Sequence, residues 1–134
     1  MGYGNTEAFL STGERESLIQ RYLGKTVTVT IDRPIGFHHV TKGIHLYYTV
    51  NYGFLPGVPG GDGEEQDVYV LGVAEPLQTF TGSVIGVVRR RDDNEDKLVA
   101  VPEGMAFSAK QIAQAIHFVE KYFDSTIESI FDGK

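Results

Sequence analysis

The sequence contains no cysteine and no long run of apolar residues. Without cysteine, the chain can form neither a disulfide framework nor a thiolate zinc site. No apolar stretch approaches the roughly 20 residues of a membrane span, and the first residues lack the basic start and apolar core of a signal peptide. We therefore expect a soluble cytoplasmic protein without membrane contact.

Positive charge is also scarce, because 12 Lys and Arg stand against 18 Asp and Glu, for a net charge of −6. Nucleic acids and anionic membranes reward clustered basic residues, so neither is an expected partner. The 134 residues, 41% of them hydrophobic, are enough to build one core. We expect one domain spanning residues 1–134.

The hydrophobic pattern changes from mainly strand-like to helical along the chain. A short helix is expected after an N-cap at Ser11 or Thr12, and it should end at Gly24. A longer helix over 108–123 is expected to begin with a capping box of Ser108 and Gln111. Strands are expected over 25–32, 43–54, 67–75, 81–93 and 97–104. The predicted fold is mainly β with α (α+β): a small five-stranded OB-like barrel, a C-terminal helix packed on it and a short N-terminal helix.

Two acidic turns stand at strand ends, over residues 62–67 and 92–96. The first holds four carboxylates within six residues, and such charges repel one another unless a cation lies among them. Oxygen-rich groups of this kind suit Mg²⁺ or Mn²⁺. The alternative is that both turns are simply solvated. In a barrel the two turns can converge, which favours a metal site.

Three segments in order, "NYGFLPG", "DGEEQDVYVL" and "GVVRRRDDNEDKLVAVP", resemble the soluble inorganic pyrophosphatases of the first family. The resemblance covers about residues 28–122 and marks a short, divergent member. It implies hydrolysis of inorganic pyrophosphate to two phosphates by a metal-activated water, with Mg²⁺ as cofactor and Mn²⁺ as the other candidate. It also implies a homo-oligomer.

The resemblance assigns roles to particular residues. The metal ligands it implies are Asp62, Asp67 and Asp92, with a further one at Glu95 or Asp96. Glu64 would orient the attacking water, and Asp67 and Lys97 complete the catalytic group. The substrate's phosphates would be bound by Tyr48, Tyr52, Tyr122 and Lys97. Asp32 stands where the family has a glutamate.

The chain also lacks three positively charged residues that the family pattern contains. A lysine-containing segment is replaced by residues 35–46, an expected arginine has Lys42 as its nearest substitute, and Phe123 stands in place of a lysine. Strand alternation places Arg90 on the face of Asp92, so Arg90 is a candidate for substrate binding. Arg33, His38 and His39 are further candidates to replace the lost cations. The alternative reading of the arginines at 89–91 is a solvated strand edge.

Two other functions remain open on the sequence alone. The missing cations leave room for a phosphate-ligand binding protein or a hydrolase of another phosphoanhydride. An oligonucleotide-binding barrel would follow from fold class only, and it conflicts with the negative charge.

Overall fold

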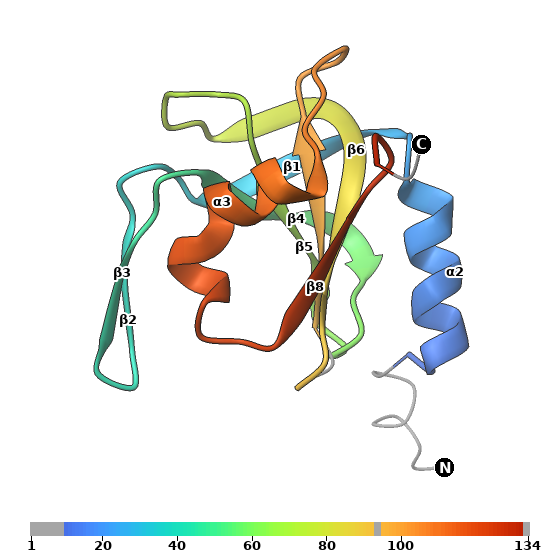
Figure 1. Ribbon diagram of the computed structural model, residues 1–134, viewed down its shortest axis with the longest axis horizontal. Helices are drawn as coiled ribbons and strands as arrows, with labels where there is room; N and C mark the ends of the chain where they lie inside the picture. Colours follow the sequence, from blue (N-terminus) through green and yellow to red (C-terminus); the bar gives the residue numbers. More distant parts are fainter. Residues whose placement is uncertain (1–9, 93–94, 133–134) are drawn as a thin grey trace.

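The computed structural model describes residues 10–92 and 95–132, so Asp93 and Asn94 of the second acidic turn lie outside the described residues. The helices are α2 (Thr12–Tyr22) and α3 (Ala109–Glu120). The strands are β1 (Thr26–Arg33), β2 (His38–Thr41), β3 (Ile44–Tyr47), β4 (Asn51–Pro59), β5 (Glu65–Val70), β6 (Thr79–Arg90), β7 (Asp96–Val101) and β8 (Ser125–Ser129) (Figure 1). Among the described residues, no helix combines the length and apolar character that a membrane crossing requires.

Five strands close into a barrel in the order β1-β4-β5-β7-β6, because β6 also pairs with β1. All of these pairings are antiparallel except that of β5 with β7. Strand β6 can serve two neighbours because it is 12 residues long: its first part pairs with β1 and its second with β7. The expected mainly-β barrel with two helices is confirmed.

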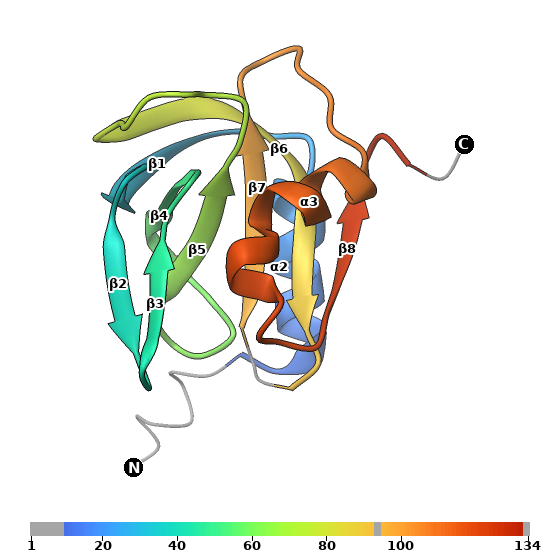
Figure 2. The same cartoon turned by 60° about the vertical axis from the view of Figure 1, so that its left-hand side comes forward.

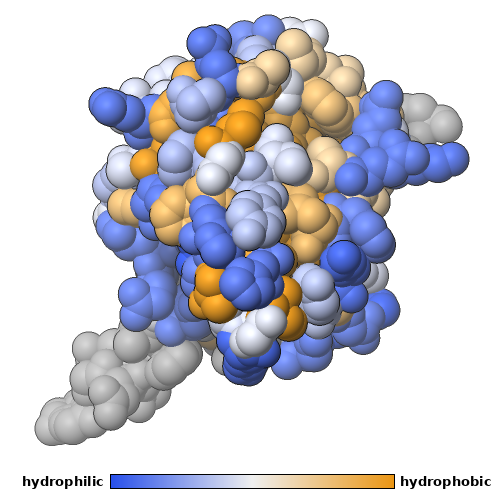
Figure 3. Space-filling view, turned by 90° about the vertical axis from the view of Figure 1, so that its left-hand side faces the viewer, coloured by the Kyte–Doolittle hydropathy of each residue, from blue (hydrophilic) through white to orange (hydrophobic). Residues whose placement is uncertain are grey.

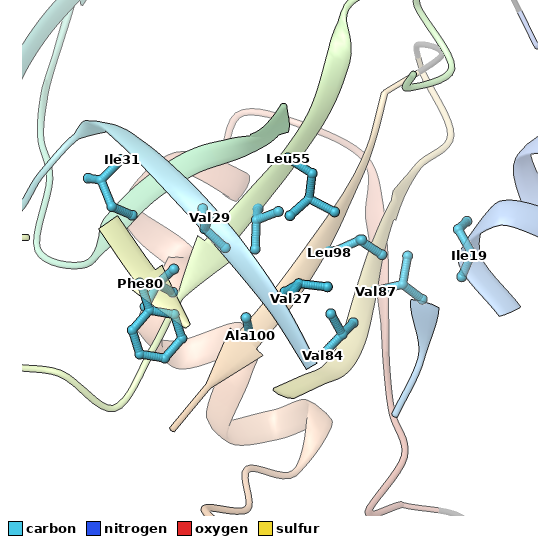
Figure 4. Packing of buried hydrophobic residues seen from close by; sticks show 12 residues of the cluster. Ile19, Val27, Val29, Ile31, Leu55, Phe80, Val84, Val87, Leu98 and Ala100 are labelled. Atoms are coloured by element: carbon cyan, nitrogen blue, oxygen red, sulfur yellow. The ribbon is translucent and has the colours of Figure 1, made fainter. Parts of the chain in front are cut away.

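The barrel interior is filled by alternate residues of its strands, as the pleat requires. Leu98 and Ala100 of β7 point inward and are fully buried (Figure 4). Val68 and Val70 of β5 are fully buried in the same cluster. Ile19 of α2 lies near the barrel end on the side of Val87 (Figure 4). The predicted N-cap of α2 is confirmed at Ser11, whose side chain accepts from the Glu14 N–H in a capping box.

Helix α3 packs on the outside of the barrel (Figure 2). Ile112 and Ile116 are fully buried against outward-facing residues of the strands, among them Val88 and Val99. Burying one such side chain contributes on the order of 1.5–3 kcal/mol. The capping box predicted for this helix is present at Ser108. The helix ends at Glu120, so Tyr122, expected on its apolar face, lies beyond its end.

The strand predicted over 43–54 was wrong as a single element. The structure divides it into β3, which forms a separate hairpin with β2, and β4, which belongs to the barrel. The hairpin turn holds Lys42 at φ 50 and Gly43 at φ 78, the left-handed conformations of a tight two-residue turn. Strand β4 also continues to Pro59, five residues beyond the predicted end of the strand at residue 54, with a register shift after Leu55. Strands β2 and β8 were not predicted.

Candidate active site

A cavity of about 430 Å³ lies outside the barrel, where β4 to β7 face the end of α3 and the β2–β3 hairpin. Figure 3 shows the molecule from the side of this hairpin, with hydrophilic and hydrophobic side chains interspersed. Seven predicted site residues line the cavity: Tyr48, Tyr52, Asp67, Arg90, Glu95, Lys97 and Tyr122. Asp32, Arg33, His39 and Lys42 line it as well.

Within the segment Asn51-Tyr52-Gly53, the two flanking residues fix the position of Tyr52 in the cavity. The fully buried Asn51 side chain accepts from the backbone N–H groups of Ile35 and Leu77, both at 3.1 Å, and thereby ties two loops to β4. Gly53 lies against β1, where an added Cβ would stand 1.9 Å from the carbonyl oxygen of Thr30. Tyr52, between them, is held at the cavity wall.

The Lys97 ammonium is the centre of a polar cluster in the cavity. It donates to the Tyr52 hydroxyl at 2.8 Å, to Asp67 at 2.7 Å and to Glu95 at 2.5 Å, while the Lys97 side chain is only 4% exposed. Burial works to raise the pKa of Glu95, but Lys97, Arg90 and a hydrogen bond with Asp62 outweigh it and hold that pKa below its ordinary value. Glu95 is therefore a carboxylate at neutral pH.

A second basic group comes from the end of β1. Arg33 Nη1 donates to the Tyr48 hydroxyl at 2.7 Å, and its guanidinium lies 5.5 Å from the centre of the Tyr52 ring. Partial burial raises the pKa of Asp32, with Arg33 opposing the shift. The tight hairpin turn brings Lys42 to the same cavity, where it adds another cation.

The three consecutive arginines point in different directions, as strand alternation predicts. Arg89 pairs with Glu16 at 2.9 Å and Arg91 with Asp124 at 2.7 Å, both away from the cavity. Arg90 faces the cavity and is 8% exposed.

Arg90 is bound by an acid that sequence reasoning missed. Its Nε and Nη2 donate to the two oxygens of Glu120 at 3.2 and 2.7 Å, and the Tyr69 hydroxyl donates to Glu120 at 2.6 Å. Burial and the nearby Glu120 raise the pKa of Tyr69 well above its ordinary value, so Tyr69 remains a donor. Helical spacing was the available signal, because Glu120 follows the buried Ile112 and Ile116 at intervals of four.

Four predicted site residues do not line the cavity. Asp62 lies in the adjoining turn, where its Oδ1 accepts from the Glu64 N–H at 3.0 Å. The Glu64 and Asp92 side chains are exposed, and Asp92 accepts from the Asp124 N–H at 3.2 Å.

Asp96 is directed away from the cavity. Both Nε and Nη2 of Arg15 in α2 donate to Asp96 Oδ2, at 3.0 and 2.7 Å. Neighbouring strand residues point to opposite faces, and Lys97 occupies the cavity face of β7. Of the two alternatives at the end of the acidic turn, the structure brings Glu95 to the cavity and not Asp96.

The two adjacent histidines also separate. His39 lines the cavity, and burial together with Arg33 lowers its pKa. His38 lies on the other face of the hairpin, where its Nε2 is 2.8 Å from Nδ1 of His45 and its ring stacks on Tyr47. Only His39 is placed to meet a ligand in the cavity.

Comparison with known proteins decides the family. The family model for inorganic pyrophosphatase matches residues 24–132. The chain belongs to the inorganic pyrophosphatase family. The inorganic pyrophosphatase of Xylella fastidiosa (strain 9a5c) is 34% identical over 94 residues, which are 65% of this chain and 51% of that protein. The Aquifex pyrophilus enzyme is 34% identical over 88 residues, 59% of this chain and 48% of its own length. The chain thus spans about half the length of the curated relatives it matches.

Solved structures of inorganic pyrophosphatases share the fold. The Ehrlichia chaffeensis structure aligns with a TM-score of 0.61 at 21% identity, covering 81% of this chain and 88% of its own. The Coxiella burnetii structure aligns with a TM-score of 0.55 at 20% identity, covering 80% and 84%. Identities this low establish the architecture alone.

The family implies a divalent metal, and the cavity offers a partial fit. Within residues 10–92 and 95–132, no three Asp, Glu, His or Cys side chains are grouped tightly enough to hold an ion as they stand. Asp67 and Glu95 nevertheless converge on one positive charge, the Lys97 ammonium, and Asp62 lies against Glu95. Carboxylate oxygens that already surround a cation fit Mg²⁺ in kind, so a pyrophosphatase metal could be held by these residues.

Proposed function

We propose that this chain hydrolyses inorganic pyrophosphate to two phosphates with Mg²⁺ as cofactor, or Mn²⁺ in its place. The observation that carries the proposal is the convergence of Asp67 and Glu95 on one cation beside Tyr52, in a cavity that also presents Arg33, Lys42 and Arg90. Carboxylates for a metal and cations for phosphate oxygens are the two parts that phosphoryl transfer to water requires.

Asp67, Glu95 and Asp62 are the proposed metal ligands. A bound divalent ion would lower the pKa of its water and offset the negative charge of the phosphates. Glu64 and Asp92 keep the roles that the resemblance implies, orienting water and binding metal, as part of this proposal. Their exposed side chains leave them free to turn without a large loss of packing.

The phosphate-binding groups are proposed to be Lys97, Arg90 and the tyrosines Tyr48, Tyr52 and Tyr122. Burial and Asp67 raise the pKa of Tyr52 well above its ordinary value, so its hydroxyl stays protonated and can donate to a phosphate oxygen. Arg33 and Lys42 also line the cavity and add positive charge to it. Such fixed donors stabilise developing charge without reorganising during the reaction.

A second candidate function rests on one observation: Lys97 engages both Asp67 and Glu95 directly. A cavity whose carboxylates stay paired with lysine would bind a phosphate ligand without turnover, or act on another phosphoanhydride. We further propose that residues 1–134 form a single domain, that the protein is cytoplasmic and that it forms a homo-oligomer.

The test is phosphate release from pyrophosphate, measured with Mg²⁺, with Mn²⁺ and with EDTA. Metal-dependent release supports the hydrolase. Calorimetric binding of pyrophosphate without release would instead support the binding protein, and release only from an organic phosphoanhydride would support the other hydrolase.

A further inference from the structure

Arg90 is the one arginine of residues 89–91 that lines the cavity, and three neighbours contact its guanidinium. Its Nη1 lies 3.4 Å from Glu95 Oε1. Glu120, the last residue of α3, binds the Nε and Nη2 edge of the guanidinium. The centre of the Phe123 ring lies 3.6 Å from the guanidinium carbon. A two-pronged carboxylate contact and an aromatic stack together set the plane of an arginine.

The position of Glu120 is costly for an acid. It is 6% exposed, and it ends a helix, where the backbone dipole disfavours negative charge. A buried ion pair is weak support for stability, because an apolar pair of similar volume often does as well. Stability alone therefore gives no good reason for Glu120, and the placement of Arg90 gives one.

We propose that Glu120 is a positioning residue that holds Arg90 where it binds a phosphate of the substrate. Tyr69 assists by donating to Glu120, and Phe123, which stands where the family has a lysine, supplies the surface on which Arg90 lies. Arg90 would thus take over the place of that lysine. The inference rests on the proposed function only in that the ligand is a diphosphate.

The direction in which Glu120→Gln changes ligand binding distinguishes a positioning role of Glu120 from a purely electrostatic one. Glu120→Gln removes a negative charge beside the cavity, so Coulomb attraction alone would tighten the binding of an anion. If Glu120 positions Arg90, binding must weaken, because one prong is lost and the guanidinium can turn. We expect the Kd for a non-hydrolysable diphosphonate, measured with Mg²⁺, to rise about tenfold, the size of one charge-assisted hydrogen bond. The KM for pyrophosphate should rise similarly, with a smaller change in kcat.

A double-mutant comparison tests whether Glu120 acts through Arg90. In an Arg90→Met background, Glu120→Gln should change the Kd less than twofold. The matched control is Glu16→Gln, which breaks the equally two-pronged pair with Arg89 outside the cavity. This control should leave the Kd unchanged.

Unchanged or tighter diphosphonate binding by Glu120→Gln, or an equal loss in the Arg90→Met background, overturns the inference. If Glu120→Gln does not fold, Arg90→Lys decides, because lysine keeps the charge but cannot make the two-pronged contact. Wild-type affinity in Arg90→Lys also overturns it. A wild-type protein that binds the diphosphonate but releases no phosphate from pyrophosphate would contradict the proposed function and leave this test intact.

Discussion

Replacing Lys97 with methionine should destabilise the metal-free protein and increase its response to Mg²⁺. Methionine keeps most of the aliphatic packing but removes the charge that Asp67 and Glu95 share. Breaking a fully buried ion pair costs about 3–5 kcal/mol, whereas an exposed pair contributes about 1 kcal/mol or less. The two carboxylates are 31% and 34% exposed, so we expect an intermediate loss of about 2 kcal/mol.

For a chain of this size, 1 kcal/mol corresponds to about 3–5 °C in Tm, so the variant should melt about 6–10 °C below the wild type in EDTA. Differential scanning calorimetry measures this directly. Adding Mg²⁺ should then raise the Tm more in the variant, because the ammonium no longer competes for the carboxylates. Lys110→Met, at an exposed position of α3, is the control and should change stability by about 0.5 kcal/mol or less. Equal Tm values in EDTA, or equal Mg²⁺ shifts in variant and wild type, would refute the reasoning.

Three further outcomes follow from the site. Asp96→Asn should weaken the ion pair with Arg15 and lower the free energy of unfolding by about 2 kcal/mol, yet leave the KM for pyrophosphate unchanged. A large loss of kcat would instead indicate that Asp96 binds the metal. Folding lowers the pKa of Glu95. The Glu95 carboxylate therefore stabilises the folded protein above the ordinary pKa of a glutamate, and this stabilisation is lost as the pH falls. In metal-free buffer, the Tm of Glu95→Gln should therefore fall less than that of the wild type between about pH 6 and pH 3. Equal falls in Tm would contradict a stabilising role of the Glu95 carboxylate. His39 has a lowered pKa and is neutral at pH 7, so His39→Ala should raise the KM for pyrophosphate mainly at acidic pH, and a pH-independent ratio of KM values would argue against a charge role.

The barrel could be predicted because its strands carry strong local patterns. The alternating Val and Thr of β1 and the apolar runs of β5 and β7 bury one or both faces, and the capping box of α3 marks its start. The hairpin was missed because its residues 44–47 run into β4 with no glycine or proline between them. Only tertiary pairing with β2 separates the two strands.

The site could be predicted where strand alternation or the family pattern applies. Arg90 does line the cavity, but the prediction placed it there through Asp92, which does not line it. Alternation applied from Lys97 would have chosen Glu95 over Asp96. Glu120 could not be identified with its partner from sequence, because the pairing joins α3 to β6 across 30 residues. Long-range ion pairs of this kind depend on how the helix packs on the barrel.

The most direct test of the central claim compares the wild type with Asp67→Asn for phosphate release from pyrophosphate at saturating Mg²⁺. Asp67 accepts a hydrogen bond from the Lys97 ammonium, the cation that it shares with Glu95. Asparagine has nearly the same shape as aspartate but carries no charge. We predict metal-dependent release by the wild type and a loss of at least about 100-fold in the variant, with an unchanged circular dichroism spectrum. Near wild-type turnover by Asp67→Asn, or no release by the wild type with either Mg²⁺ or Mn²⁺, would contradict the account.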